Sequence, residues 1–275
     1  MAQLAPLEQR RAYRAIAQPN PLRKEIRIEA VNAGGVPSRW IIPAGVPDDA
    51  PVLLYFHGGS YRYGSYESHA ELISRLGKAA HVRVLVPDYR LAPPDRFPAA
   101  ADDAATVLRW LGDQRVVVSG DSAGGALAIA AMLGAKECKP RGALLICPWV
   151  DLTARGGSLE TNSQWDWAGP EHFIDWAQGC AEESQWKEPR LSPLFADLTG
   201  LPPMLIQLGE AEMLHDQVIA FADKARRNGV DVRLTVEPDM IHDWHLLTMI
   251  SPIAAKSIEE AGAFVRVRLT TPERY

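Results

Sequence analysis

Eight short runs of apolar, mostly β-branched residues recur along the chain, and each has the length of a β-strand. The first, Ile26–Val31, alternates apolar and polar residues, as a strand with one buried face does, and Arg39–Ile42 is a candidate partner for it. The last six are almost continuously apolar, which is typical of strands buried on both faces of a parallel sheet. These six runs are Val52–Phe56, Val82–Val86, Val116–Ser119, Ala143–Cys147, Met204–Leu208 and Val232–Val236.

Helical patterns lie between these strand candidates, and the alternation predicts an α/β fold with a mostly parallel sheet covered by helices on both faces. No internal repeat or low-complexity linker divides the chain, so we expect a single domain over residues 1–275. In sheets of this kind ligands bind at the carboxyl ends of the strands, and functional residues are expected there. The predicted helices are Ser68–Ala80, Ala99–Leu111, Gly125–Leu133, Pro170–Trp186 and Asp216–Arg227.

Composition and charge narrow the class of protein. The 275 residues are 47% hydrophobic and carry a formal net charge of −5, which excludes a disordered or collagen-like chain and argues against a nucleic-acid partner. No apolar run is long enough for a membrane span or a signal peptide. Cys138, Cys147 and Cys180 are odd in number and lack a metal-binding spacing, so we expect reduced core thiols in a soluble cytoplasmic protein.

The pattern G-x-S-x-G occupies positions 120–124, between a predicted strand and a predicted helix. Its glycines permit a tight turn that projects the Ser122 hydroxyl above the sheet, and the helix N-terminus offers free N–H groups there. A glycine-rich turn with a serine N-cap is the alternative. The strand before and the helix after the pattern favour Ser122 as a nucleophile.

A nucleophilic serine needs a base, and the base needs an orienting acid, which in this fold follow in the order serine, acid, histidine. His242 and His245 come after the last predicted strand, where the base is expected. Glu210, Glu212 and Asp216 come after the preceding strand, and position alone does not choose among these three carboxylates. The H-x-x-H spacing of the two histidines has no third ligand motif beside it, so we expect no metal.

A second glycine-rich turn follows the strand candidate Val52–Phe56 and reads HGGSY at positions 57–61. Glycines let the backbone approach a ligand, and the exposed N–H groups of such a turn can stabilise a developing oxyanion. A simple β-turn is the alternative. Ala123 comes directly after Ser122, which is where this kind of site places a further donor.

Taken together, these blocks closely resemble the α/β-hydrolase superfamily, and specifically the hormone-sensitive-lipase family of carboxylesterases. The resemblance covers about residues 50–250 and is carried, in order, by HGGS at 57–60, PDYRLAP at 87–93, GDSAGG at 120–125, EMLHD at 212–216 and IHDWH at 241–245. It implies an α/β-hydrolase fold, with an eight-stranded and mostly parallel sheet, a small helical cap and a serine esterase activity that uses no cofactor.

The resemblance also implies residue roles. Ser122 matches the nucleophile and His242 the base, while Glu212 matches the acid, where aspartate is the commoner residue, and Asp216 a structural aspartate. The oxyanion donors would be the N–H groups of Gly59, Ser60 and Ala123, with Gly58 shaping the turn. Two departures stand out: Ser60 replaces the usual third glycine of H-G-G-G, and Asp243 follows His242 where glycine is common, so that a nearby carboxylate could raise the pKa of the histidine.

The family's cap combines an N-terminal segment, here about residues 1–22, with an insertion that is here about residues 154–200. Four of the eight tryptophans fall between positions 165 and 186, inside this insertion. We expect alanine at Trp165 or Trp167 to change substrate preference more than stability, and alanine at Trp176 to do the reverse. The residues expected to line the pocket are Tyr61, Trp149, Trp165, Trp167, Phe173 and Trp244.

Few charges interrupt these aromatic residues, so we expect a neutral short- to medium-chain ester as the substrate. A lactone, amide or carbamate hydrolase would use the same triad and remains an alternative. A non-catalytic receptor is a more distant one, because plant gibberellin receptors resemble this family but lack the histidine that is present here as His242. The last strand, Val232–Val236, would lie at a sheet edge, where a homodimer could form.

Overall fold

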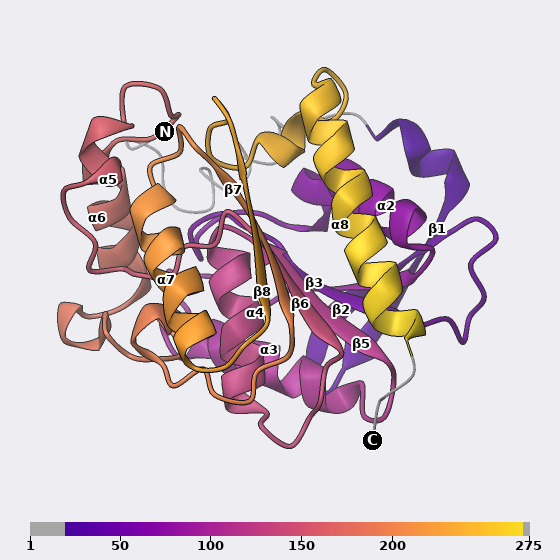
Figure 1. Ribbon diagram of the computed structural model, residues 1–275. Coiled ribbons are helices and arrows are strands. Elements are labelled where there is room, and N and C mark those ends of the chain that lie inside the picture. Colours follow the sequence, from indigo (N-terminus) through magenta and orange to yellow (C-terminus); the bar gives the residue numbers. More distant parts are fainter. Residues whose placement is uncertain (1–19, 272–275) are drawn as a thin grey trace.

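A computed structural model describes residues 20–271 of the chain, and it contains one eight-stranded sheet (Figure 1). The strand order is β1-β2-β4-β3-β5-β6-β7-β8, in which β2 pairs antiparallel with both of its neighbours and all other pairs are parallel. The predicted α/β-hydrolase sheet is therefore confirmed, and β8 lies at one edge. The strands are β1 Ile26–Ala33, β2 Val36–Pro43, β3 Val52–Phe56, β4 Arg83–Pro87, β5 Val116–Asp121, β6 Gly142–Ile146, β7 Met204–Gly209 and β8 Val232–Glu237.

Helices cover both faces of the sheet, as the alternating pattern predicts (Figure 1). Helices α2 and α8 pack together on one face, and α3, α4 and α7 lie on the other. The α-helices are α2 Tyr66–Ala80, α3 Ala99–Trp110, α4 Ala123–Gly134, α5 Ser158–Thr161, α6 Pro170–Cys180, α7 His215–Arg227 and α8 Pro252–Thr270. Short 3-10 helices are η1 Pro21–Glu25, η2 Glu183–Gln185, η3 Pro193–Phe195 and η4 Trp244–Leu247.

Two apolar cores result, one on each face of the sheet. Strand β3 shows the reason, because its side chains alternate between the faces and none is exposed: Leu53 and Tyr55 join the core under α2 and α8, while Leu54 and Phe56 join the core under α3, α4 and α7. Burial on both faces requires the continuous apolar runs seen in the sequence. The strand ends that carry the glycine-rich turns are thereby held in fixed positions.

Three helices differ from the sequence prediction, and one of them is the four-residue α5, which has no predicted counterpart. The predicted helix Pro170–Trp186 stops at Cys180, because Ala181 takes an extended conformation, and a separate turn, η2, follows. Helix α8 was not predicted, although Ser251 caps it through the N–H of Ala254 and Pro252 stands at its first turn. Its buried residues recur every three or four positions, which is the pattern that would have indicated it.

The stretch between β6 and β7 contains α5, α6, η2 and η3, in the region where the insertion 154–200 was expected. The expected N-terminal cap segment, residues 1–22, lies almost entirely outside the described residues. Among the helices of residues 20–271, none combines the length and the apolar character that crossing a membrane requires. Cys147 and Cys180 are buried as expected, whereas Cys138 is only partly buried, and all three thiols are free.

Candidate active site

Ser122 lies at the tight turn between β5 and α4, in a backbone conformation that side chains rarely adopt (φ 52°, ψ −122°). The flanking glycines allow this turn. A Cβ at Gly120 would collide with the carbonyl of Gly124, and a Cβ at Gly124 would collide with the carbonyl of Phe56. The N–H of Ser122 donates to the carbonyl of Ile146 at 2.9 Å, which ties the turn to β6. Strain of this kind is typical of functional sites.

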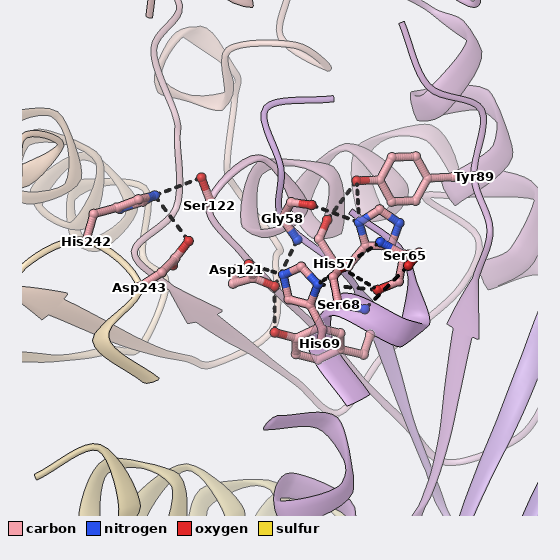
Figure 2. A network of polar contacts seen from close by, with 11 residues as sticks. His57, Gly58, Ser65, Ser68, His69, Tyr89, Asp121, Ser122, His242 and Asp243 are labelled. Carbon is pink, nitrogen blue, oxygen red and sulfur yellow. Dashed lines mark hydrogen bonds and ion pairs between the residues drawn. The ribbon is translucent and has the colours of Figure 1, made fainter. Parts of the chain in front are cut away.

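His242 comes from the loop after β8 and meets this serine. Its Nε2 is 2.9 Å from Oγ of Ser122, although the two residues are 120 positions apart in the chain (Figure 2). Both side chains are nearly buried, with 6% of Ser122 and 5% of His242 exposed. The distance is that of a hydrogen bond through which the hydroxyl proton can pass to the imidazole.

Glu212 lies behind the histidine and is fully buried. Its Oε1 is 3.5 Å from Nδ1 of His242, and its Oε2 accepts the N–H of Gly209 at 2.9 Å. The other two candidate acids face elsewhere. Glu210 is exposed, and the exposed Asp216 accepts the N–H of Ser158 at 2.8 Å. Of the three carboxylates, Glu212 alone approaches His242.

Asp243 brings a second carboxylate to the same imidazole, at 3.3 Å from Nε2 (Figure 2). Its backbone is left-handed (φ 53°), a conformation that aspartate tolerates better than most residues. Burial alone would lower the pKa of His242, but the carboxylates of Asp243 and Glu212 outweigh burial and raise it. Oδ1 of Asp243 is buried and has no hydrogen-bond partner among the described residues.

The backbone N–H groups beside Ser122 divide into two kinds. The N–H of Gly58 donates to Oδ1 of Asp121 at 3.0 Å and so holds the turn in place. The N–H groups of Gly59, Ser60 and Ala123 donate to no other residue within the described part of the chain. Gly59 and Ser60 both have positive φ, 114° and 56°, which is costly for a serine. Free N–H groups of this kind can act as oxyanion donors, which is the role that the sequence resemblance predicts for these three.

Asp121, the residue before the serine, organises a buried polar network that the sequence did not indicate (Figure 2). Its carboxylate accepts the hydroxyl of Tyr55 at 2.6 Å and lies 3.1 Å from Nε2 of His69. Burial opposes a charged His69, but the adjacent Asp121 outweighs burial and raises the pKa of His69. The network joins β3, α2 and β5 directly beneath the Gly58 turn. The only signal for it was a carboxylate in the G-x-S-x-G motif.

His57 and His245 are neutral core residues rather than bases. Burial lowers the pKa of His57 to about 4, and its ring stacks on Tyr89, whose hydroxyl donates to the carbonyl of His57 at 2.7 Å. Burial lowers the pKa of His245 to about 3, and its Nε2 bonds Oε1 of Gln207 at 3.0 Å. The choice of His242 over His245 agrees with these contacts.

The aromatic residues expected at the pocket separate into three groups. Tyr61, Trp149 and Phe173 form a nearly buried row, with ring centroids of successive members 6.3 and 5.5 Å apart. Trp165 and Trp167 are 65% and 54% exposed. Trp244 was expected at the pocket but lies in the core beneath α2 and α8, on the other face of the sheet from Trp149, and its Nε1 donates to Oγ of Ser257.

Cys147, Glu212 and His242 each offer a metal-ligating atom, and these atoms lie within 4.8 Å of one another. Burial and the neighbouring Glu212 raise the pKa of the Cys147 thiol well above its ordinary value. A thiol must lose its proton to bind a metal, so a metal ion at these atoms would have to displace the proton of Cys147. The carboxylate and the imidazole instead fit an acid–base pair that includes Ser122.

Comparisons with known proteins agree with this geometry. Residues 53–246 match a family model described as the alpha/beta hydrolase fold. An acetyl-hydrolase of Streptomyces hygroscopicus is 39% identical over 252 residues, which cover 86% of this chain and 82% of the relative. An ethyl acetate hydrolase of Pseudomonas putida is 36% identical over 219 residues, which cover 72% of this chain and 69% of the relative. An esterase of the bacterial hormone-sensitive-lipase family superposes with a TM-score of 0.93, at 36% identity, over 97% of this chain and 93% of that one.

Proposed function

This chain belongs to the hormone-sensitive-lipase family of α/β-hydrolases and is a carboxylic ester hydrolase, and we propose that it cleaves neutral short- to medium-chain esters with a triad of Ser122, His242 and Glu212. The observation that carries the proposal is the 2.9 Å contact between Nε2 of His242 and Oγ of Ser122, with Glu212 buried behind the imidazole. The arrangement supplies a nucleophile, a base next to it and an orienting acid behind the base.

In the proposed first step, Oγ of Ser122 attacks the ester carbonyl carbon while its proton passes to Nε2 of His242. The negative charge moves to the carbonyl oxygen, where the N–H groups of Gly59, Ser60 and Ala123 stabilise it. The loss of one such donor typically raises the barrier by about 3 kcal/mol. Glu212 faces the Nδ1–H group of the imidazolium and stabilises its positive charge without taking the proton.

In the second step, the tetrahedral intermediate collapses and His242 gives its proton to the departing alcohol. A water molecule then gives a proton to His242 and attacks the acyl carbon. As the acyl bond to Ser122 breaks and the acid leaves, His242 returns this proton to Oγ of Ser122. Every proton in this cycle is carried by His242, so the cycle needs no cofactor.

The substrate class rests on the aromatic row of Tyr61, Trp149 and Phe173 and on the two exposed tryptophans of the insertion. A wall of neutral rings favours apolar acyl and alcohol groups over charged ones. The names acetyl-hydrolase and ethyl acetate hydrolase of two relatives support short acyl groups as the first choice for testing.

The test compares Ser122→Ala with Ser119→Ala, a buried serine three positions earlier on β5 whose hydroxyl has no partner among the described residues. With p-nitrophenyl acetate, we expect Ser122→Ala to lose on the order of 10⁴-fold or more of kcat and Ser119→Ala to stay active. Full activity in Ser122→Ala would overturn the triad. An organophosphate that labels wild type but not Ser122→Ala would separate an enzyme from a non-catalytic receptor.

A substrate panel then decides between ester and other acyl-transfer substrates. It contains nitrophenyl esters of increasing acyl length, a lactone series, an anilide and a carbamate. We expect the highest kcat/KM for the short esters. A higher kcat/KM for lactones, anilides or carbamates would keep the triad and reassign the substrate.

A further inference from the structure

The proposed acid and base of the triad stand on two separate loops. We call residues 209–213 the acid turn and residues 238–243 the histidine loop. The N–H of Ala211 donates to the carbonyl of Met240 at 3.0 Å, which joins the two loops away from the reacting atoms. Oε1 of Glu212 and Nδ1 of His242 are 3.5 Å apart, slightly beyond hydrogen-bond length. A small displacement of either loop therefore makes or breaks this contact.

A short piece of the insertion, Asn162–Trp167, touches both loops, and we call it the bridging segment. It holds both polar groups of the peptide bond that follows Glu212. Nδ2 of Asn162 donates to the carbonyl of Glu212 at 3.0 Å, and Oδ2 of Asp166 accepts the N–H of Met213 at 2.9 Å. Because the two groups point in opposite directions, this peptide plane is fixed from both sides.

The same segment reaches the base through Trp167. Nε1 of Trp167 donates to the carbonyl of His242 at 3.1 Å. The indole also stacks on the imidazole, with ring centroids 5.9 Å apart and an interplanar angle of 28°. The indole is 54% exposed, so it contributes less to the core than a buried tryptophan would. Its contacts are directed at the histidine loop instead.

The bridging segment has internal hydrogen bonds that keep these groups in register. The N–H of Trp165 donates to the carbonyl of Asn162 at 2.9 Å, and the N–H of Trp167 donates to Oδ1 of Asp166 at 2.8 Å. Asp166 thus uses one oxygen for its own turn and the other for the acid turn. A movement of the segment is transmitted to both loops together.

From these contacts we infer that the bridging segment is a positioning element for the triad, which sets the separation between Glu212 and His242 according to the place of the insertion. The inference rests on the proposed triad and extends it, because it gives Asn162, Asp166 and Trp167 a role in the rate of the chemical step. A displacement of about 1 Å in a catalytic group can cost about 100-fold in rate, so hydrogen bonds at this distance from the reacting atoms are enough to matter. The insertion would then control catalysis through the loops as well as by covering the substrate.

The experiment uses Asn162→Ala, which removes the donor to Glu212, and Trp167→Phe, which keeps a ring and removes the donor to His242. Ser163→Ala and Gln164→Ala are matched controls in the same turn, because their side chains bond Glu160 and Thr161 rather than either loop. For each variant, kcat and KM for p-nitrophenyl acetate are measured across pH, together with the melting temperature and the downfield proton resonance of the histidine Nδ1–H.

We expect both test variants to lose about tenfold in kcat with KM changed less than about twofold. A weaker contact with Glu212 lowers the pKa of His242, so the acidic limb of the kcat profile moves to lower pH and the downfield resonance weakens or disappears. The controls keep wild-type kcat and the same acidic limb. A lower melting temperature with unchanged kcat and pH profile would overturn the inference, as would a change confined to KM.

Failure of this inference is separable from failure of the proposed triad. If Ser122→Ala retains activity, the triad is wrong whatever the bridging variants do. If Ser122 is required but Asn162→Ala and Trp167→Phe keep the wild-type kcat and acidic limb, only the positioning role is wrong.

Discussion

The carboxylate of Asp243 lies 3.3 Å from Nε2 of His242, the same nitrogen that approaches Oγ of Ser122 at 2.9 Å. The imidazole therefore has one carboxylate on each side, since Glu212 faces Nδ1. Ionised carboxylates at these positions favour the protonated imidazole, while burial raises the pKa of Asp243 itself well above its ordinary value. A glycine at this position would leave Nε2 to the serine and the leaving group alone.

Replacing Asp243 by asparagine should move the activity profile to lower pH. The pKa of His242 is raised in part by Asp243, and the triad needs a neutral imidazole as its base. Activity is therefore lost as pH falls through the pKa of His242. This acidic limb of the activity profile moves to lower pH when the charge of Asp243 is removed. The measurement is kcat/KM for p-nitrophenyl acetate against pH. Asp239→Asn, at an exposed position of the same loop with a similar φ of 58°, is the control and should leave the limb in place. An unmoved limb in Asp243→Asn would show that this carboxylate does not act on the base.

Replacing Asp121 by alanine should reduce both stability and activity. The substitution removes the acceptor of the Tyr55 hydroxyl, the Gly58 N–H and the His69 ring, all of which are buried. Breaking a buried charged pair typically costs about 3–5 kcal/mol in the free energy of unfolding. We expect a loss of that size in urea unfolding, and a fall in kcat because the Gly58 turn loses its anchor. Asp121→Asn keeps an acceptor and should lose less of both. Equal losses in the two variants would argue against the hydrogen-bonding role.

Removing the Ser60 hydroxyl should leave the rate nearly unchanged, because the proposed oxyanion donor is the backbone N–H. We expect Ser60→Ala to keep kcat for p-nitrophenyl acetate within about twofold. Ser60→Gly relieves a left-handed conformation that costs a non-glycine residue about 1–2 kcal/mol, so it should also raise the free energy of unfolding. The increase should be smaller than this cost, because glycine adds conformational entropy to the unfolded chain. A loss in Ser60→Ala as large as that of an oxyanion donor would mean that the hydroxyl takes part.

The tryptophans of the insertion should respond differently to alanine. Trp176 is half-buried and packs edge-on against Phe173 with ring centroids 5.1 Å apart, so Trp176→Ala should lower the free energy of unfolding by about 1–3 kcal/mol. Trp165 is 65% exposed, so Trp165→Ala should change stability by about 0.5 kcal/mol or less and alter the acyl-length preference instead. Thermal melts and kcat/KM over the nitrophenyl ester series test this division. If the two variants give the same pattern, the tryptophans do not have separate roles.

Much of the fold was predictable because burial on both faces of the sheet demands continuous apolar runs. All eight predicted strands are present, and Val52–Phe56 matches β3 at both ends. The helix Pro170–Trp186 was predicted too long, since apolar spacing does not report the extended backbone at Ala181. The turn at Ser122 was also predictable, because contacts of Gly120 and Gly124 with backbone atoms leave no room for side chains.

The local sequence could not show which carboxylate contacts His242. Glu210, Glu212 and Asp216 all follow β7, and the resemblance to a family, rather than the pattern itself, favoured Glu212. In the structure Glu212 is buried, with Oε1 3.5 Å from Nδ1 of His242, whereas Asp216 lies in the first turn of α7 and accepts the N–H of Ser158. Their difference depends on which way each peptide turns after the strand, and contacts from the distant residues Asn162 and Asp166 hold that turn.

The sequence by itself therefore determined the succession of strands and helices along the chain and the tight turn at Ser122, because these depend on local periodicity and on glycines whose requirements are steric. The class of chemistry followed from the resemblance of its motifs to a family. Only the tertiary structure decided which side chains meet at His242. That outcome places Glu212 beside Nδ1, sets Asp121 in a buried network with His69, and buries Trp244 in the core. Each of these contacts joins residues through the packing of several elements, and no spacing along one element records it.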